Sequence, residues 1–230
     1  MDKLTEDNDS EWTVWESSTY NVLSIDLDWC QSHFHLKQLN RLFYSKIDKA
    51  KKIVFGRHHH QIMFDLMNRE NIVLHNIDHH HDVQYEDFQI PDIVDNGIST
   101  HGCWVGNLIH LGKIKEYYWY KNLNSECKFS DFVTSLVCNQ HRLPFHIKED
   151  LSDLAKIETY DLIFVCHSPD YITPAFHSLY ESYLDCCAIL YGSKSKMTEL
   201  LTDLPNAPIF LSDLLEFTPK YIPTTGTANV

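Results

Sequence analysis

Residues 72–82 read IVLHNIDHHHD, an apolar run that leads directly into a run of acids and histidines. A short apolar run with this boundary predicts a buried strand that ends near Ile77. Side chains alternate along a strand, so Asp78, His80 and Asp82 would point the same way as the strand ends. Two carboxylates and one imidazole in this pattern are candidate ligands for a divalent metal such as Mn, Fe, Zn or Ni. A polar loop in a histidine-rich chain is the alternative interpretation.

The pattern of an apolar run followed by polar residues recurs along the chain. Further strands are predicted at residues 21–25, 52–55, 115–120 and 161–165. Apolar residues at helical spacing predict one helix after residues 52–55 and another after Pro174. Short apolar runs that alternate with helical patterns are typical of a mostly parallel sheet covered by helices. The predicted fold is therefore α/β, a three-layer αβα sandwich.

The length and composition fit a single domain. The chain has 230 residues, of which 43% are hydrophobic, and this is enough to bury one good-sized core. We expect one domain over residues 1–230, with an N-terminal arm at 1–18. A proline-containing C-terminal segment at 205–230 is expected to wrap the domain and then fray.

Charge and cysteine content restrict the partners and the compartment. The formal net charge of −13 argues against binding to nucleic acid or to anionic membranes, and it is compatible with a cationic substrate or bound divalent ions. The seven cysteines are odd in number and form no Cys-x-x-Cys pattern, which favours free thiols in a reducing cytoplasm. The first ten residues are acidic without an apolar signal region, and no apolar run approaches ~20 residues, so we expect no secretory signal and no membrane span.

Polar residues gather where the predicted strands end. They are Asp26 and Asp28, the histidines at 58–60, the run at 78–82, and His167 with Asp170. In open α/β sheets, ligands bind outside the carboxyl ends of the strands. Isolated carboxylates are costly at buried strand ends, so several of them converging there indicate bound cations. An exposed turn is the alternative interpretation of Asp26 and Asp28.

These residues resemble the arginase–deacetylase superfamily, whose metal site uses a His after one strand, Asp-x-His-x-Asp after the next and Asp-x-Asp after a later one. The resemblance covers about residues 20–190. The chain resembles the peptide-arginase-like branch of the superfamily more closely. The segments that carry it read RHHHQIM at 57–63, HNIDHHHD at 75–82, GCWVGNLI at 102–109 and SPDYITP at 168–174. Two departures are visible. The Asp-x-Asp strand comes first here, as in a circular permutation, and Arg57 or His58 replaces an acidic residue.

The resemblance implies a site with two manganese ions. One ion would be held by His59, Asp78, Asp82 and Asp26, and the other by His80 and Asp28, with Asp78 and Asp26 bridging. His58 is the alternative to His59, because the three consecutive histidines leave the register open. Trp104 is expected to be a core residue.

The function implied by the resemblance is that of an arginase-type hydrolase. A metal-activated hydroxide would attack the guanidino carbon of arginine, free or in a peptide or protein, and release urea. His101 is the candidate proton shuttle, and Asp170 the candidate partner of the guanidinium group; a loop histidine and a turn residue are the alternatives. A single-metal deacetylase-like amidohydrolase and a non-catalytic binding protein on the same fold are the competing functions. The number of bound metals separates the first two.

Overall fold

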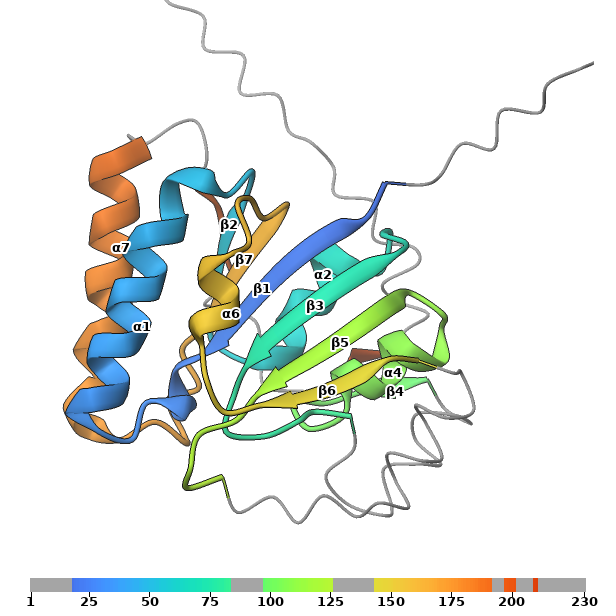
Figure 1. Ribbon diagram of the computed structural model, residues 1–230, viewed down its shortest axis with the longest axis horizontal. Coiled ribbons are helices and arrows are strands. Elements are labelled where there is room, and N and C mark those ends of the chain that lie inside the picture. The colour runs from blue at the N-terminus through green and yellow to red at the C-terminus, as the bar shows by residue number, and fades with distance from the viewer. Residues whose placement is uncertain (1–17, 84–96, 126–142, 192–196, 202–208, 211–230) are drawn as a thin grey trace, which may run out of the picture.

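A seven-stranded parallel sheet forms the centre of the protein (Figure 1). The structure is a computed structural model that describes residues 18–83, 97–125, 143–191, 197–201 and 209–210. The strands of the sheet are β1 (Tyr20–Asp26), β2 (Ile53–Gly56), β3 (Ile72–Ile77), β5 (Ile114–Tyr120), β6 (Phe145–Lys148), β7 (Leu162–Cys166) and β8 (Met197–Leu201). Their order across the sheet is β6-β5-β3-β1-β7-β2-β8. Two short strands, β4 (Ile98–Ser99) and β9 (Ile209–Phe210), form a separate antiparallel pair.

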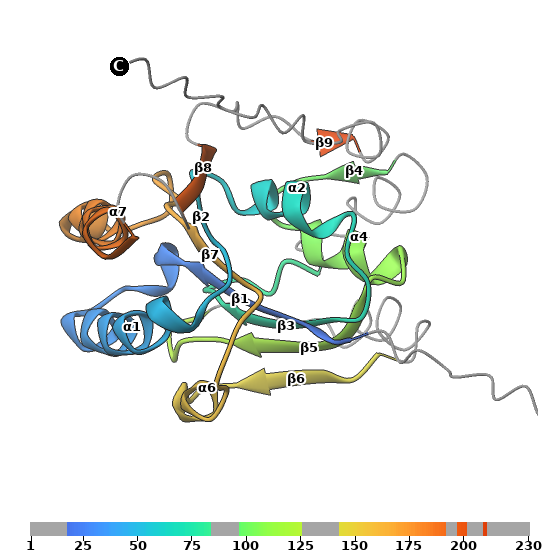
Figure 2. The same cartoon turned by 90° about the horizontal axis from the view of Figure 1, so that it is seen from above.

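Helices cover both faces of the sheet, which confirms the predicted three-layer α/β arrangement (Figure 2). One face carries α1 (His33–Lys46), α6 (Ser152–Ala155) and α7 (His177–Tyr191). The other face carries α2 (Met63–Leu66) and α4 (Trp104–His110). Short 3-10 turns follow several elements: η1 (Leu27–Trp29), η2 (Ile47–Lys49), η3 (His59–Ile62) and η6 (Pro174–Phe176).

Each face of the sheet has its own apolar core. Leu23 and Ile25 of β1 pack into the core beneath α1 and α7, whereas Val22 packs into the core beneath α2 and α4. This division follows from the alternation of side chains along a strand. Both cores are formed by residues that are essentially inaccessible to solvent, so the central strands are fixed from both sides.

The central strands end at the same edge of the sheet. In the parallel register, Asp26 of β1 lies beside Cys166 of β7, and Cys166 lies beside Gly56 of β2. On the other side of β1, Ile25 pairs with Ile77 of β3. The chain leaves β1 through α1 to reach β2, and it returns through α2, on the opposite face, to β3. The polar segments that follow β1, β2, β3 and β7 therefore converge where the direction of winding changes.

The five predicted strands are all present, and so are the helices predicted after residues 52–55 and after Pro174. The prediction did not include α1, the edge strands β6 and β8, or the β4–β9 pair. Residues 1–17 of the expected N-terminal arm lie outside the described residues, as does the expected C-terminal segment apart from β9.

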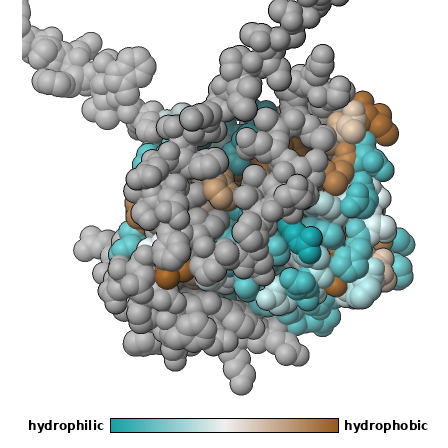
Figure 3. Space-filling model, turned by 180° about the vertical axis from the view of Figure 1, so that it is seen from behind, coloured by the Kyte–Doolittle hydropathy of each residue, from teal (hydrophilic) through white to brown (hydrophobic). Residues whose placement is uncertain are grey.

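The described helices are all too short or too polar to cross a membrane. On the side seen in Figure 3, hydrophilic residues form most of the described surface, and hydrophobic residues occur in small separate groups. A few large apolar side chains are nevertheless exposed, notably Phe34 and Leu123 near the edge where the strands end, and Ile189 near the end of α7.

His75 makes the stability of the fold depend on pH. It is buried in β3, stacks on Tyr118 with ring centroids 4.7 Å apart, and has its Nδ1 atom 3.2 Å from the Tyr120 hydroxyl. Burial lowers the pKa of His75 to about 4, although the charge of Glu116 acts in the opposite direction. The unfolded chain therefore binds a proton at His75 between pH 6.5 and pH 4 that the folded chain does not, so stability falls as the pH falls through this window.

We expect His75→Phe to reduce this acid sensitivity while keeping the ring stacked on Tyr118. The free energy of unfolding of the variant should fall less than that of the wild type between pH 6.5 and pH 4, by up to about 3 kcal/mol. Urea denaturation at several pH values measures the difference. In the variant, the Tyr120 hydroxyl loses its partner, which lowers the free energy of unfolding by the same amount at every pH. This loss alone would make the pH profiles of the two proteins parallel, and parallel profiles would contradict the prediction.

Candidate metal centre

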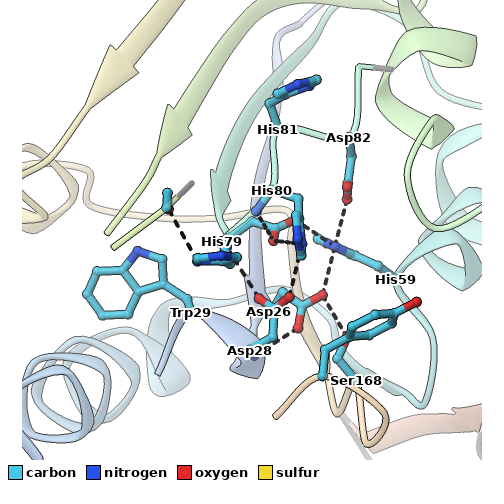
Figure 4. A network of polar contacts seen from close by, with 12 residues as sticks. Asp26, Asp28, Trp29, His59, His79, His80, His81, Asp82 and Ser168 are labelled. Carbon is cyan, nitrogen blue, oxygen red and sulfur yellow. Dashed lines mark hydrogen bonds and ion pairs between the residues drawn. The ribbon is translucent and has the colours of Figure 1, made fainter. Parts of the chain in front are cut away.

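Six side chains from the ends of three central strands meet in one cluster, and Figure 4 labels five of them. Asp26 is the last residue of β1 and Asp28 lies in η1 directly after it, His59 begins η3 after β2, and Asp78, His80 and Asp82 follow β3. Five of these residues are buried, and only the His80 side chain is partly open, with 26% exposed. The structure thus brings together all six residues that the sequence analysis named as metal ligands.

His59 lies at the centre of the buried part of the cluster. Its Nδ1 atom is close to one oxygen of each of three carboxylates, 3.1 Å from Asp26, 3.0 Å from Asp78 and 2.9 Å from Asp82. None of these contacts has hydrogen-bond geometry. The other ring nitrogen, Nε2, lies 2.6 Å from the hydroxyl of Ser24. A single ring nitrogen carries at most one proton and so cannot satisfy three carboxylates, whereas a cation among these four groups could.

A second group of ligand atoms lies beside the first and is more open. The Nδ1 atom of His80 is 3.1 Å from Oδ2 of Asp28 and 3.9 Å from Oδ1 of Asp78. Asp78 directs its other oxygen, Oδ2, to His59. Two sets of three possible metal ligands therefore share Asp78, and within each set the ligand atoms lie within 4.8 Å of one another.

Further polar groups hold the carboxylates in place. The hydroxyl of Ser168 donates to Oδ2 of Asp26 at 2.7 Å, and the amide of Asn76 donates to Oδ2 of Asp78 at 3.2 Å. The backbone N–H groups of Asp28 and His80 donate to Oδ1 of Asp26 and Oδ1 of Asp78, respectively. Neither Ser168 nor Asn76 is among the site residues predicted from the sequence.

Two residues of the site have unusual backbone conformations. Asp82 has φ of 51° and Ser168 has φ of 46°, and both values lie in the left-handed region that side chains other than glycine rarely adopt. Each conformation costs about 1–2 kcal/mol. Strain of this kind is often found where a fold directs side chains into a functional site.

The pKa values within the cluster reflect crowded, buried charge. Burial, with the charges of Asp26 and Asp78, raises the pKa of Asp28 to about 8. Burial and the charge of Asp82 raise the pKa of Asp78 to about 7. Burial raises the pKa of Asp26 too, but its contacts with His59 outweigh this and leave the value lowered.

The pKa values of both imidazoles in the cluster are raised, which favours their charged form. Burial favours neutral His59, but the charge of Asp78 and the three close carboxylates raise its pKa well above the usual value. Burial likewise favours neutral His80, yet its contact with Asp28 and the charges of Asp28, Asp78 and Asp82 raise its pKa to about 9. Protons therefore supply part of the positive charge that the four carboxylates attract.

The structure places His59, and not His58, in the cluster. His58 takes the N-cap position of η3, where its backbone N–H donates to Oε1 of Gln61 at 3.0 Å. Its ring stacks on that of His60, with centroids 6.1 Å apart. The 3-10 turn thus directs His59, the middle one of the three histidines, toward the carboxylates of Asp26 and Asp78.

The candidate residues His101 and Asp170 lie outside the cluster, near its open side. The Nε2 atom of His101 is 3.1 Å from the hydroxyl of Tyr171, whose ring centroid lies 6.2 Å from that of His80. Burial lowers the pKa of His101. Asp170 is exposed and precedes Tyr171 in the turn after β7. His167, the other polar residue expected at this strand end, turns toward α7, where its Nε2 atom lies 3.2 Å from Nδ1 of His177.

The chain matches no protein-family model, no curated protein and no solved structure.

Proposed function

We propose that this protein is a metal-dependent hydrolase of the arginase type, with a dinuclear centre that acts on a guanidino group and releases urea. The observation that carries the proposal is the position of Asp78, which shares its two oxygens between two sets of buried ligand atoms. Asp26, His59, Asp78 and Asp82 would hold the inner ion, and Asp28, Asp78 and His80 the outer one. Two divalent ions so placed would lower the pKa of a water molecule and stabilise developing negative charge.

The charge of the cluster supports the presence of cations. Four carboxylates face two imidazoles, so negative charge remains in excess even when both imidazoles are protonated. Uncompensated charge in a buried place is costly, and this cluster is almost completely buried. Two divalent ions would remove that excess and would release the protons that His59 and His80 hold.

The donor atoms favour manganese or a similar ion. Both sets of ligands found in the described residues consist of carboxylate oxygens and imidazole nitrogens, without a thiolate. Cys166 lies beside Asp26 in the strand register, and burial raises the pKa of its thiol well above the usual value. Its sulfur lies 3.1 Å from the hydroxyl of Ser168, which donates to Asp26, and 3.6 Å from the backbone carbonyl oxygen of Arg57.

Residues on the open side fit a planar cationic substrate. His101 and Tyr171 form a hydrogen-bonded pair beside His80, and a histidine here could pass a proton to a leaving amine. Asp170 lies two residues after Ser168, in the segment that follows β7. Its exposed carboxylate could accept paired hydrogen bonds from a guanidinium group. The net charge of −13 would attract such a substrate.

The test combines metal analysis with product analysis. Purified protein should bind two manganese ions after reconstitution, measured by elemental analysis, and should then release urea from arginine or from arginine-containing peptides. Metal removal by a chelator should abolish urea release, and added manganese should restore it. One bound ion together with cleavage of acetyl-lysine peptides would instead support the deacetylase-like alternative. Absence of metal after reconstitution would overturn both enzymatic proposals.

A further inference from the structure

Trp104, the first residue of α4, is fully buried beside the candidate metal centre. We propose that Trp104 is a positioning residue, whose indole ring holds Asp82 and His59 in one relative arrangement for metal binding. The inference rests on the proposed metal centre and adds a residue to it that binds no metal itself. From the sequence, Trp104 is expected only to be part of the core.

The indole ring contacts ligands from two different strand ends. Its Nε1–H group donates to Oδ2 of Asp82 at 2.5 Å, and this is the same oxygen that lies 2.9 Å from Nδ1 of His59. The ring also packs on the His59 imidazole, with centroids 4.9 Å apart. Asp82 follows β3 and His59 follows β2, two strands that do not pair with each other. Trp104 therefore links them across the sheet edge.

Backbone hydrogen bonds also connect Asp82 to α4. The carbonyl oxygen of Asp82 accepts hydrogen bonds from the N–H groups of Val105 at 3.0 Å and Gly106 at 3.3 Å. These bonds help to keep Asp82 in its left-handed conformation, with φ of 51°. The indole bond then fixes the carboxylate of a residue whose backbone α4 already holds. An indole N–H only donates and carries no charge, so it orients the carboxylate without competing with a cation for charge.

Trp119 provides a matched control within the same protein. It is also buried, with 2% of its surface exposed, and its Nε1–H group donates a hydrogen bond to the segment that follows β3. Its acceptor is the backbone carbonyl of Asp78, at 3.0 Å, and not a carboxylate oxygen. If Trp104 only packs the core, its replacement should affect metal binding as replacement of Trp119 does. If it is a positioning residue, its replacement should weaken metal binding more.

The first experiment detects the contact in the metal-free protein. In ¹⁵N-labelled protein we expect the indole N–H resonance of Trp104, assigned with Trp104→Phe, to lie strongly downfield because its acceptor is a carboxylate. Asp82→Asn should shift this resonance and leave that of Trp119 nearly unchanged. An unshifted Trp104 resonance would overturn the proposed contact whether or not any metal binds.

The second experiment measures the consequence for manganese. Trp104→Phe keeps an aromatic ring but removes the donor, and we expect it to weaken Mn²⁺ binding about 10- to 100-fold, with Trp119→Phe within about 3-fold of wild type. Free Mn²⁺ is followed by electron paramagnetic resonance, and the fold of each variant is checked by circular dichroism and thermal melting. Equal weakening by both variants would overturn the positioning role alone. No binding by the wild type would overturn the proposed metal centre, and the positioning role with it.

Discussion

Asp78→Asn is expected to remove metal from both positions of the centre. Asp78 is the residue that the two sets of ligands share, with Oδ2 directed to His59 and Oδ1 toward His80. An amide keeps the size of the side chain but not its negative charge, and hard divalent ions bind it much more weakly. We therefore expect bound manganese to fall from two ions to none, and urea release to fall to background.

The same variant separates metal binding from folding. Without metal, the ionised carboxylate of Asp78 adds to an excess of buried negative charge, and its raised pKa, about 7, shows that this charge is unfavourable. At pH 8 the metal-free variant should therefore be more stable than metal-free wild type by roughly 1–3 kcal/mol. With manganese at about 1,000 times its dissociation constant, only the wild type should gain the additional ~4 kcal/mol that binding supplies.

Thermal and urea melts with a chelator and with manganese measure both effects. Asp161→Asn is the matched control, because Asp161 lies at the opposite end of β7 and accepts from Lys51 at 2.6 Å and from the backbone of Asn21 at 2.8 Å. The control should lose a little stability and bind two ions. Retention of metal by Asp78→Asn would exclude Asp78 as the bridging ligand.

The fold could be predicted where local pattern and final environment agree. Helices cover both faces of the central strands, so β7 appears as a short continuous apolar run and β1 as a run that only Ser24 interrupts. The edge strand β6, with the sequence FHIK, has no fully buried residue and lacks that signal. The helix α1 does carry buried residues at helical spacing, Leu39, Leu42 and Phe43, and an N-cap at Ser32. Both signals are visible in the sequence and predict a helix here.

The candidate ligands could be predicted because parallel strands end together. Asp26 meets the residues after β3 because β1 pairs with β3 in register, from Tyr20 with Ile72 to Ile25 with Ile77. The early place of the Asp-x-Asp strand in the chain does not matter for this meeting, since β1 lies between β3 and β7 in the sheet. Spatial order, not chain order, determines which residues converge.

The residues that support the ligands could not be predicted in the same way. Ser168 and Asn76 are common residue types, and their roles depend on which oxygen of which carboxylate they face. Trp104 lies 22 positions from Asp82, and an apolar residue at the start of a helix predicts packing rather than a hydrogen bond to a carboxylate. Such roles depend on tertiary contacts that neither spacing nor composition encodes.

Alanine substitutions at two adjacent histidines, His59 and His58, are expected to differ strongly in their effect on manganese binding. His59→Ala removes the imidazole whose Nδ1 atom lies within 3.1 Å of an oxygen of each of Asp26, Asp78 and Asp82. We expect it to weaken manganese binding at the inner position at least about 100-fold, since changes beyond the ligands themselves already cost 10- to 100-fold. The outer set keeps Asp28, Asp78 and His80, so one ion should remain bound. His58→Ala changes a buried neighbour outside the cluster and should leave two ions bound.

Stability measurements make the comparison sharper. In the metal-free protein His59 is the positive partner of three carboxylates, and loss of one partner from a buried ionic group costs about 3–5 kcal/mol. His58→Ala removes a ring at the N-cap position of a short turn and should cost only about 1 kcal/mol. If His59→Ala does not fold, His59→Gln preserves a polar side chain for the metal titration. Loss of metal from the His58 variant, with metal retained by the His59 variants, would contradict the arrangement seen here and favour the other register of the histidine run.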